Sequence, residues 1–244
     1  MMDVEDLEYL ESEAHGSVVL LRMDHESENR FSLPFINELE MALSRAEEDA
    51  AVRALVFTGA HEKYFSNGLD LPWLIKQERS TWLDFTLSWE ALLHRLFLFG
   101  KPVVAAINGH AFAGGLFFAL AADWRVMRKD RGWCCIPEID LPLDLPPGNV
   151  ALIAHVIGSR NADYYSLSAD RLPPEEALRI GMMDELADAV EVVPCAIRKA
   201  EELSKKNQDQ YARHKRNLRA APARALKEED PPYIREMIET GKHG

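Results

Sequence analysis

Apolar residues along the chain gather in short runs that alternate with longer stretches of helical spacing. Four runs predict buried strands, over residues 17–23, 53–58, 102–107 and 124–127. A shorter run at 133–136 predicts a further strand. The run "PVVAAI" at 102–107 is apolar throughout, which is typical of a strand covered on both faces of its sheet.

Helical patterns fill the intervals between these runs. Ser32 is a residue type that caps helices, and the sequence after it predicts a helix with Pro34 in its first turn. A longer helix is predicted to begin at Ser80 or Thr81 and to end before Gly100. From about residue 149 onward the pattern is helical. The fold class is therefore predicted to be α/β, with a core over residues 1–190 and a helical C-terminal region over residues 191–244.

Composition and charge narrow the class of protein. The chain has 244 residues, of which 47% are hydrophobic, so it can bury a substantial core. The net charge of −12 is concentrated in residues 1–50, which argues against nucleic-acid binding. Residues 205–219 hold six Lys or Arg against one Asp, a pattern we interpret as a solvated helix face. No apolar run is long enough to span a membrane, so no membrane partner is expected. The three cysteines lack metal-type spacing, which favours reduced thiols, a cytoplasmic location and no metal site.

Two segments place glycine between a strand and a helix. They are "KYFSNGLDLPWL" at 63–74 and "NGHAFAGGLFFALAAD" at 108–123. In each, glycine permits a sharp turn, and the helix that follows begins with amide groups that lack intrahelical partners. Two such amides that converge on one point would bind an oxygen that gains negative charge. Taken separately, each segment also fits an ordinary strand-to-helix turn.

Glu138 is the candidate for proton transfer. It lies in "WCCIPEIDLPLDLPPG", residues 133–148, where an apolar run precedes it and Ile139 follows it. Desolvation raises the pKa of a carboxyl group toward neutrality, which suits it to take and return a proton at carbon. The alternative is a glutamate in an exposed turn.

Taken in order, these segments resemble the enoyl-CoA hydratase/isomerase (crotonase) superfamily. The likeness covers roughly residues 15–200 and is greatest to the Δ3-Δ2 enoyl-CoA isomerases. Its elements are Phe65–Leu71, Lys101–Gly109, Ala113–Gly115 with Asp123, and Pro137–Ile139. The resemblance implies a spiral of β-β-α units with a C-terminal helical oligomerisation region, and a homotrimer or a hexamer built as a dimer of trimers.

The resemblance also implies a ligand and its site. The ligand is an acyl-CoA thioester, whose oxygen would accept hydrogen bonds from the backbone N–H groups of Leu69 and Gly114. Coenzyme A is then part of the substrate, and no separate cofactor is implied. The implied substrate- or CoA-binding positions are Arg30, Ser66, Asn67, Gly68, Asp70, Gly115 and Phe117. The cation that meets the CoA phosphates is left open among Arg30, Lys63, Lys101 and the basic C-terminal segment.

One departure from the family pattern bears on the reaction. Hydratases of this superfamily use two glutamates to hold a water; Glu138 matches one of them, and Phe117 stands in the position of the other. A phenyl ring cannot orient water, so we predict isomerisation of 3-enoyl-CoA to trans-2-enoyl-CoA with Glu138 as the only proton carrier. Hydration, another reaction of the superfamily such as thioester hydrolysis or decarboxylation, and non-catalytic CoA binding remain alternatives. Another residue could also supply the second carboxylate.

An aromatic cluster offers two interpretations. Its members are Trp73, Trp82, Phe85, Trp89, Phe117 and Phe118. Aromatic residues at helical spacing are usually core, and the alternative is that they line a tunnel for the acyl chain.

Overall fold

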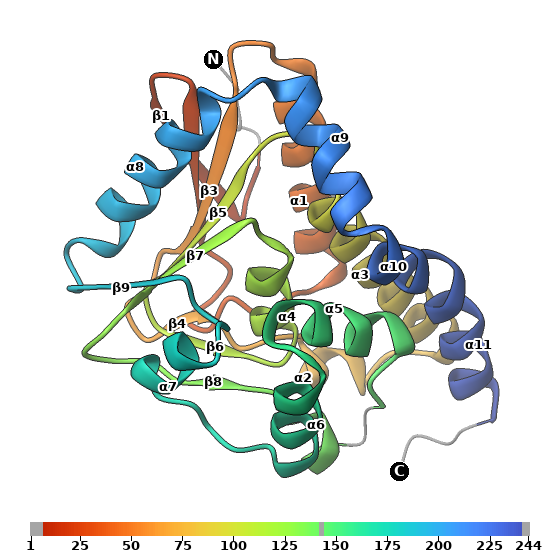
Figure 1. Ribbon diagram of the computed structural model, residues 1–244. Coiled ribbons are helices and arrows are strands. Elements are labelled where there is room, and N and C mark those ends of the chain that lie inside the picture. The colour runs from red at the N-terminus through yellow and green to blue at the C-terminus, as the bar shows by residue number, and fades with distance from the viewer. Residues whose placement is uncertain (1–6, 142–143, 241–244) are drawn as a thin grey trace.

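A six-stranded sheet forms the centre of the computed structural model, which describes residues 7–141 and 144–240 (Figure 1). Its strands run in the order β1-β2-β3-β5-β7-β9. β1 and β2 form an antiparallel hairpin, and every later neighbour pairs in parallel. The strands are β1 (Leu10–His15), β2 (Val18–Met23), β3 (Ala54–Gly59), β5 (Val103–Ile107), β7 (Trp124–Arg128) and β9 (Glu185–Ala187).

The apolar strand β5 is covered on both faces, as its sequence predicts. Val103, Ala105 and Ile107 belong to the larger hydrophobic cluster, whereas Val104 and Ala106 belong to a smaller one on the opposite face. Helix α8 (Val192–Ser204) supplies the cover of that smaller cluster. Burial on both sides explains why this strand has no alternating polar positions.

A second, smaller sheet carries the segments that lead to the candidate site. It pairs β4 (Tyr64–Ser66), β6 (His110–Phe112) and β8 (Cys134–Cys135) in parallel. β4 is followed by the short helix α2 (Leu71–Leu74), and β6 is followed by α4 (Gly114–Ala121). The sheet therefore brings both glycine turns of the sequence to the same edge.

The remaining elements are helical. They pack around the two sheets, and those after β9 form the C-terminal end of the chain (Figure 1). They are α1 (Leu33–Glu48), α3 (Arg79–Phe97), the 3₁₀ turn η1 (Glu138–Asp140), α5 (Pro147–Ile157), α6 (Ser159–Ser168), α7 (Pro174–Arg179), α9 (Gln208–Leu218), α10 (Ala220–Arg224), the π-helical turn η2 (Ala225–Glu229) and α11 (Asp230–Thr240). Within the described ranges, each helix is too short or too polar to cross a bilayer.

Most of the predicted elements are confirmed, including the α/β class with helices at the C-terminal end. Ser32 caps α1, since its hydroxyl accepts a hydrogen bond from the Phe35 N–H at 3.4 Å. The predicted start of α3 is wrong by one or two residues. The helix begins at Arg79 after Glu78, whose side chain makes no capping hydrogen bond.

The C-terminal end of α4 is held by buried ion pairs. The carboxylate of Asp123 contacts Lys215 Nζ at 2.8 Å and Arg219 Nη2 at 2.9 Å, and it accepts a hydrogen bond from the Val103 N–H at 2.8 Å. Arg219 also donates to the carbonyl of Ala121 at 3.1 Å. The interpretation of residues 205–219 as a solvated face is therefore wrong for Lys215 and Arg219. These side chains fasten the C-terminal helices to the core.

Candidate active site

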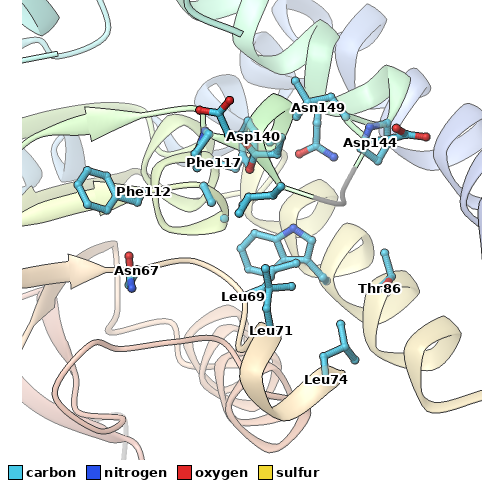
Figure 2. A pocket seen from close by; sticks show the side chains of 18 of the residues that line it. Asn67, Leu69, Leu71, Leu74, Thr86, Phe112, Phe117, Asp140, Asp144 and Asn149 are labelled. Atoms are coloured by element: carbon cyan, nitrogen blue, oxygen red, sulfur yellow. The ribbon is translucent and has the colours of Figure 1, made fainter. Parts of the chain in front are cut away.

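A pocket of about 360 Å³ opens between the two glycine turns and the C-terminal helix (Figure 2). Its lining comes from the loop before α2, from α3, the start of α4, η1, the start of α5, and Met237 of α11. Six of the predicted catalytic or binding residues line it: Arg30, Asn67, Leu69, Gly114, Phe117 and Glu138. The fold thus brings together residues that are up to 108 positions apart in the chain.

The first glycine turn is fixed by hydrogen bonds behind the pocket wall. The buried hydroxyl of Ser66 donates to the Asn29 carbonyl at 2.6 Å and accepts from the Gly68 N–H at 3.2 Å. Asp70 caps α2 by accepting from the Trp73 N–H at 3.1 Å. Ser66, Gly68 and Asp70 therefore shape the backbone on either side of Leu69, which itself faces the pocket.

The amide groups of Leu69 and Gly114 are directed by the local structure. Phe31 donates to the Gly68 carbonyl at 2.8 Å and accepts from the Asp70 N–H at 2.9 Å, as in a parallel bridge. In that pattern the N–H of the intervening Leu69 points away from Phe31. Gly114 is the first residue of α4, where an N–H has no intrahelical acceptor.

The two turns approach so closely that glycine is required. Gly68 has φ +84°, and a Cβ there would lie 2.9 Å from the Cβ of Ala113 and 3.0 Å from the amide nitrogen of Gly114. A Cβ at Gly115 would lie 2.3 Å from the carbonyl oxygen of Ser66. Gly68 and Gly115 thus lie at the contact between the two turns, where a larger residue would push the turns apart.

Glu138 is buried in the pocket wall and forms no ion pair with any residue that the structure describes. Its exposed fraction is 6%, and its Oε2 has no hydrogen-bond partner within the described residues. Burial raises the pKa of this carboxyl to about 7, against an ordinary value of 4.5, and the Glu138 N–H opposes the shift only in part. The group can therefore exchange a proton near neutral pH.

Cys135, the last residue of β8 and three positions before Glu138, lines the same pocket. Burial, and then the charge of Glu138, raises the pKa of its thiol to about 11. The thiol is therefore protonated at neutral pH, which is unfavourable for a nucleophilic role.

The aromatic cluster divides between the pocket and the core. Trp82, Trp89 and Phe117 line the pocket, whereas Phe85 and Phe118 are fully buried in the core. Trp73 packs beside the core with its ring centroid 5.9 Å from that of Phe85. Both interpretations of the cluster are thus partly right, because one side of α3 faces the pocket and the other faces the core.

Among the cations proposed for the CoA phosphates, Arg30 lies at the pocket and pairs with Glu28 at 2.5 Å. Arg171, which the sequence did not single out, also lines the pocket. Lys101 instead donates to the carbonyls of Ala46 and Asp49 at the end of α1.

The other candidate cations have different contacts. Lys63 lies over the ring of Tyr64, 5.0 Å from its centroid. Lys215 and Arg219 of the basic segment are bound to Asp123 of their own chain.

The sequence analysis missed a buried polar cluster, of which Glu90 and Asn149 line the pocket and Asp230 lies behind them. It comprises Glu90 of α3, Asn149 of α5 and Asp230 of α11, with exposed fractions of 3%, 2% and 0%. Asn149 Nδ2 donates to both Glu90 oxygens, at 2.8 and 2.9 Å, and the Gly148 N–H donates to Asp230 at 2.6 Å. The three residues are far apart in the sequence, and no local motif marks any of them.

The Glu90 and Asp230 carboxyls influence each other's ionisation. Burial, and then the charge of Asp230, raises the pKa of Glu90 well above its usual range. Burial also raises the pKa of Asp230, to about 6, while the Gly148 N–H and the hydrogen bond from Glu90 oppose the shift. Burial and the neighbouring carboxyl thus favour the protonated form of Glu90.

Comparison with known proteins gives relatives over most of the chain. The chain is 34% identical to enoyl-CoA delta isomerase 3 of Arabidopsis thaliana, over 84% of this chain and 90% of that protein. It is also 34% identical to the peroxisomal enoyl-CoA delta isomerase 2 of the same plant, over 80% and 84% of the two chains. Because that relative is named as peroxisomal, the cytoplasmic location of this chain stays a prediction.

The chain is also similar to a solved structure and matches a family model. The structure of a probable enoyl-CoA hydratase from Mycobacterium tuberculosis, EchA3, superposes with a TM-score of 0.90 at 26% identity, over 97% of this chain and 100% of that one. This similarity confirms the crotonase-like fold. The model of the family described as enoyl-CoA hydratase/isomerase matches residues 13–235. The chain therefore belongs to the enoyl-CoA hydratase/isomerase family.

Proposed function

We propose that this protein isomerises 3-enoyl-CoA to trans-2-enoyl-CoA, with Glu138 as the single acid–base group. The observation that carries the proposal is the buried carboxyl of Glu138, with Oε2 unpartnered within the described residues, in a pocket that Phe117 also lines. By the family resemblance, Phe117 stands where a hydratase would have its second glutamate. The two Arabidopsis relatives, which are named enoyl-CoA delta isomerases, support the same reaction. The hydratase name of the mycobacterial structure keeps hydration as the alternative.

In the proposed mechanism, the thioester oxygen is bound by the N–H groups of Leu69 and Gly114. Removal of a proton from C2 moves negative charge onto this oxygen, and the two donors then bind it more strongly than they bind the ground-state carbonyl. The N-terminal end of α4 adds its positive potential at the same point. Each donor of this kind contributes about 3–4 kcal/mol to lowering the barrier.

Glu138 carries the proton in both steps. Its carboxylate takes a proton from C2, the C3–C4 π electrons move into the dienolate, and the carboxylic acid returns the proton at C4. The 2,3 double bond then remains, and the carboxylate is regenerated. A pKa of about 7 places both protonation states within reach at neutral pH. The step moves one proton and needs no metal or redox cofactor.

Phe117 supports isomerisation over hydration. The side chain is 4% exposed and presents an apolar surface to the pocket, so it offers water no hydrogen bond. One observation favours the alternative, because Glu90 is a second carboxyl in the same pocket wall. Both oxygens of Glu90 already accept from Asn149, and burial and then the charge of Asp230 raise the pKa of its carboxyl, so it is poorly placed to activate water.

The remaining assignments concern the CoA moiety and the assembly. Arg30 and Asn67, which both contact Glu28, and Arg171 are proposed to meet the CoA portion of the substrate. A homotrimer or hexamer, with residues 191–244 in the contacts, is proposed from the family resemblance. Light scattering on the purified protein would measure the assembly.

A panel of unsaturated acyl-CoA thioesters tests the proposed reaction. Wild-type protein is expected to convert 3-enoyl-CoA to trans-2-enoyl-CoA, and Glu138→Gln is expected to bind saturated acyl-CoA normally but to lose turnover. If wild type binds acyl-CoA and converts none of the thioesters, the protein is a non-catalytic CoA-binding member of the family, and the proposal is wrong.

A further inference from the structure

The polar cluster of Glu90, Asn149 and Asp230 has no role in the proposed proton transfer. The wall around it is largely apolar and includes Leu71, Leu74 and Trp89. Buried ionisable groups are costly, and well-packed apolar side chains would stabilise the same position at least as well. The presence of such a cluster at a ligand pocket therefore indicates a polar contact with the bound ligand.

The cluster lies on the acyl side of the pocket. Asn67 and Phe112 lie to one side of Leu69 and Phe117 in Figure 2, whereas Thr86, Leu74 and Asn149 lie to the other. Asn67 belongs to the part of the site assigned above to the CoA moiety. The Asn149 side is then the side on which the acyl chain extends beyond the thioester.

Asn149 has one polar atom left for a ligand. Its Nδ2 is committed to the two oxygens of Glu90, which fixes the orientation of the amide. Its Oδ1 is buried and has no hydrogen-bond partner within the described residues, although the side chain lines the pocket. An amide oxygen held in this way accepts a hydrogen bond and cannot donate one.

The surrounding charge restricts the chemistry of the partner. Glu90 is hydrogen-bonded to Asn149 and Asp230 to the neighbouring Gly148, and the carboxyl groups of Asp140 and Asp144 also line this pocket. An acidic group on the acyl chain would meet repulsion from these groups. A neutral donor, such as a hydroxyl group, fits both the acceptor and the charge.

We propose that Asn149, oriented by Glu90, binds a hydroxyl group on the acyl chain, so that the pocket prefers hydroxylated acyl-CoA thioesters to plain alkyl ones. The inference rests on the proposed function for the direction in which the acyl chain lies. Because Oδ1 is already buried without a donor, a hydroxyl group that donates to it would gain a hydrogen bond that a plain alkyl chain cannot make, and this gain strengthens binding roughly 10- to 100-fold.

Binding of saturated acyl-CoA thioesters tests this preference without any turnover. All thioesters in the series have the same chain length, and each carries a single hydroxyl group at a different carbon beyond C4. The unsubstituted parent and the ω-carboxyl analogue serve for comparison. Calorimetry on wild type is expected to find one hydroxyl position that binds at least about 10-fold more tightly than the parent, and weaker binding of the carboxyl analogue. Wild type that binds no hydroxylated isomer more tightly than the parent would overturn the inference.

Two variants locate the preference. Asn149→Leu keeps the shape of the side chain and is expected to abolish the preference while binding the parent as tightly as wild type or more tightly. Thr86→Val is the matched control: Thr86 lines the pocket, but its hydroxyl already donates to the Trp82 carbonyl at 2.8 Å, so the preference should remain. A preference that survives Asn149→Leu would contradict the inference.

The wild-type series needs no variant to fold, so it decides the inference by itself. Binding of every thioester with equal affinity would overturn the hydroxyl preference but leave the isomerase proposal intact. Failure of all the thioesters to bind would overturn both.

Discussion

The two ends of α4 each lie near a buried carboxyl group, but the two groups differ in their partners. At the C-terminal end, Asp123 contacts two cations and a backbone N–H within 2.9 Å. At the N-terminal end, Glu138 lines the pocket beside Gly114, and its Oε2 has no partner within the described residues. The first carboxylate fastens the C-terminal helices to the core, whereas the second is destabilised as an ion and so is ready to accept a proton.

The largest effect is expected from the unpaired carboxyl. Glu138→Gln should lower kcat on 3-enoyl-CoA by roughly 10³- to 10⁴-fold, because an amide cannot carry a proton. Steady-state kinetics would measure the loss, and calorimetry with a saturated acyl-CoA should show that binding is kept. Asp140→Asn is the matched control, since Asp140 belongs to the same turn and lines the same pocket. Equal losses of kcat in the two variants would show that Glu138 has no special role in proton transfer.

The paired carboxyl should matter for stability instead. Asp123→Asn leaves Lys215 and Arg219 buried without their partner, and we expect it to lower the free energy of unfolding by about 3–5 kcal/mol. Denaturant titration would measure the change. Glu202→Gln breaks the exposed Lys199–Glu202 pair at 2.7 Å and should change stability by less than about 1 kcal/mol. A similar small change in both would show that the network does not anchor α4.

Glu138→Gln should also stabilise the fold at alkaline pH. The pKa of Glu138 is about 7 in the folded protein and near 4.5 when it is exposed, so the unfolded chain releases this proton first and wild type loses stability as pH rises from 4.5 to 7. The glutamine at position 138 does not titrate, so the free energy of unfolding of the variant should exceed that of wild type by about 3 kcal/mol at pH 8. Near pH 4 the loss of this titration should give no such gain in stability. A gain independent of pH would contradict this explanation.

A smaller effect is expected where the two glycine turns meet. Gly68→Ala would place a methyl group against Ala113 and the Gly114 amide, displacing one proposed donor, and should lower kcat roughly 10- to 100-fold. Gly16→Ala is the control for backbone strain, because Gly16 has φ +62° but nothing within 4 Å of its Cβ position. Its stability should fall slightly, and kcat should stay at the wild-type value. Loss of kcat in both variants would point to strain alone.

The same comparison explains what the sequence could predict. Strands over residues 17–23, 53–58, 102–107 and 124–127 were found because burial leaves continuous apolar runs. β1 was missed since it pairs only with β2, at the edge of the sheet, and exposes four successive residues, including Glu11 and Glu13. β4 and β6, with three residues each, are too short for a period to appear, whereas β8 lies within the apolar run predicted at 133–136.

The site was predictable where neighbours in the sequence define it. Glycines and a helix start mark the turns around Leu69 and Gly114, and apolar neighbours mark Glu138. The cluster of Glu90, Asn149 and Asp230 could not be found in this way, because its members meet only when α3, α5 and α11 pack together. Likewise, a basic segment such as 205–219 does not reveal that Asp123 lies opposite two of its cations.

The account depends most on the claim that a single carboxyl moves a proton without adding water. Incubation of wild type with 3-enoyl-CoA and, separately, with trans-2-enoyl-CoA in ¹⁸O-labelled water, followed by mass spectrometry, tests this directly. We expect the two isomers to interconvert, and the mass of the acyl-CoA to stay unchanged because no labelled oxygen is incorporated. Formation of a hydroxyacyl-CoA that carries the label would contradict it.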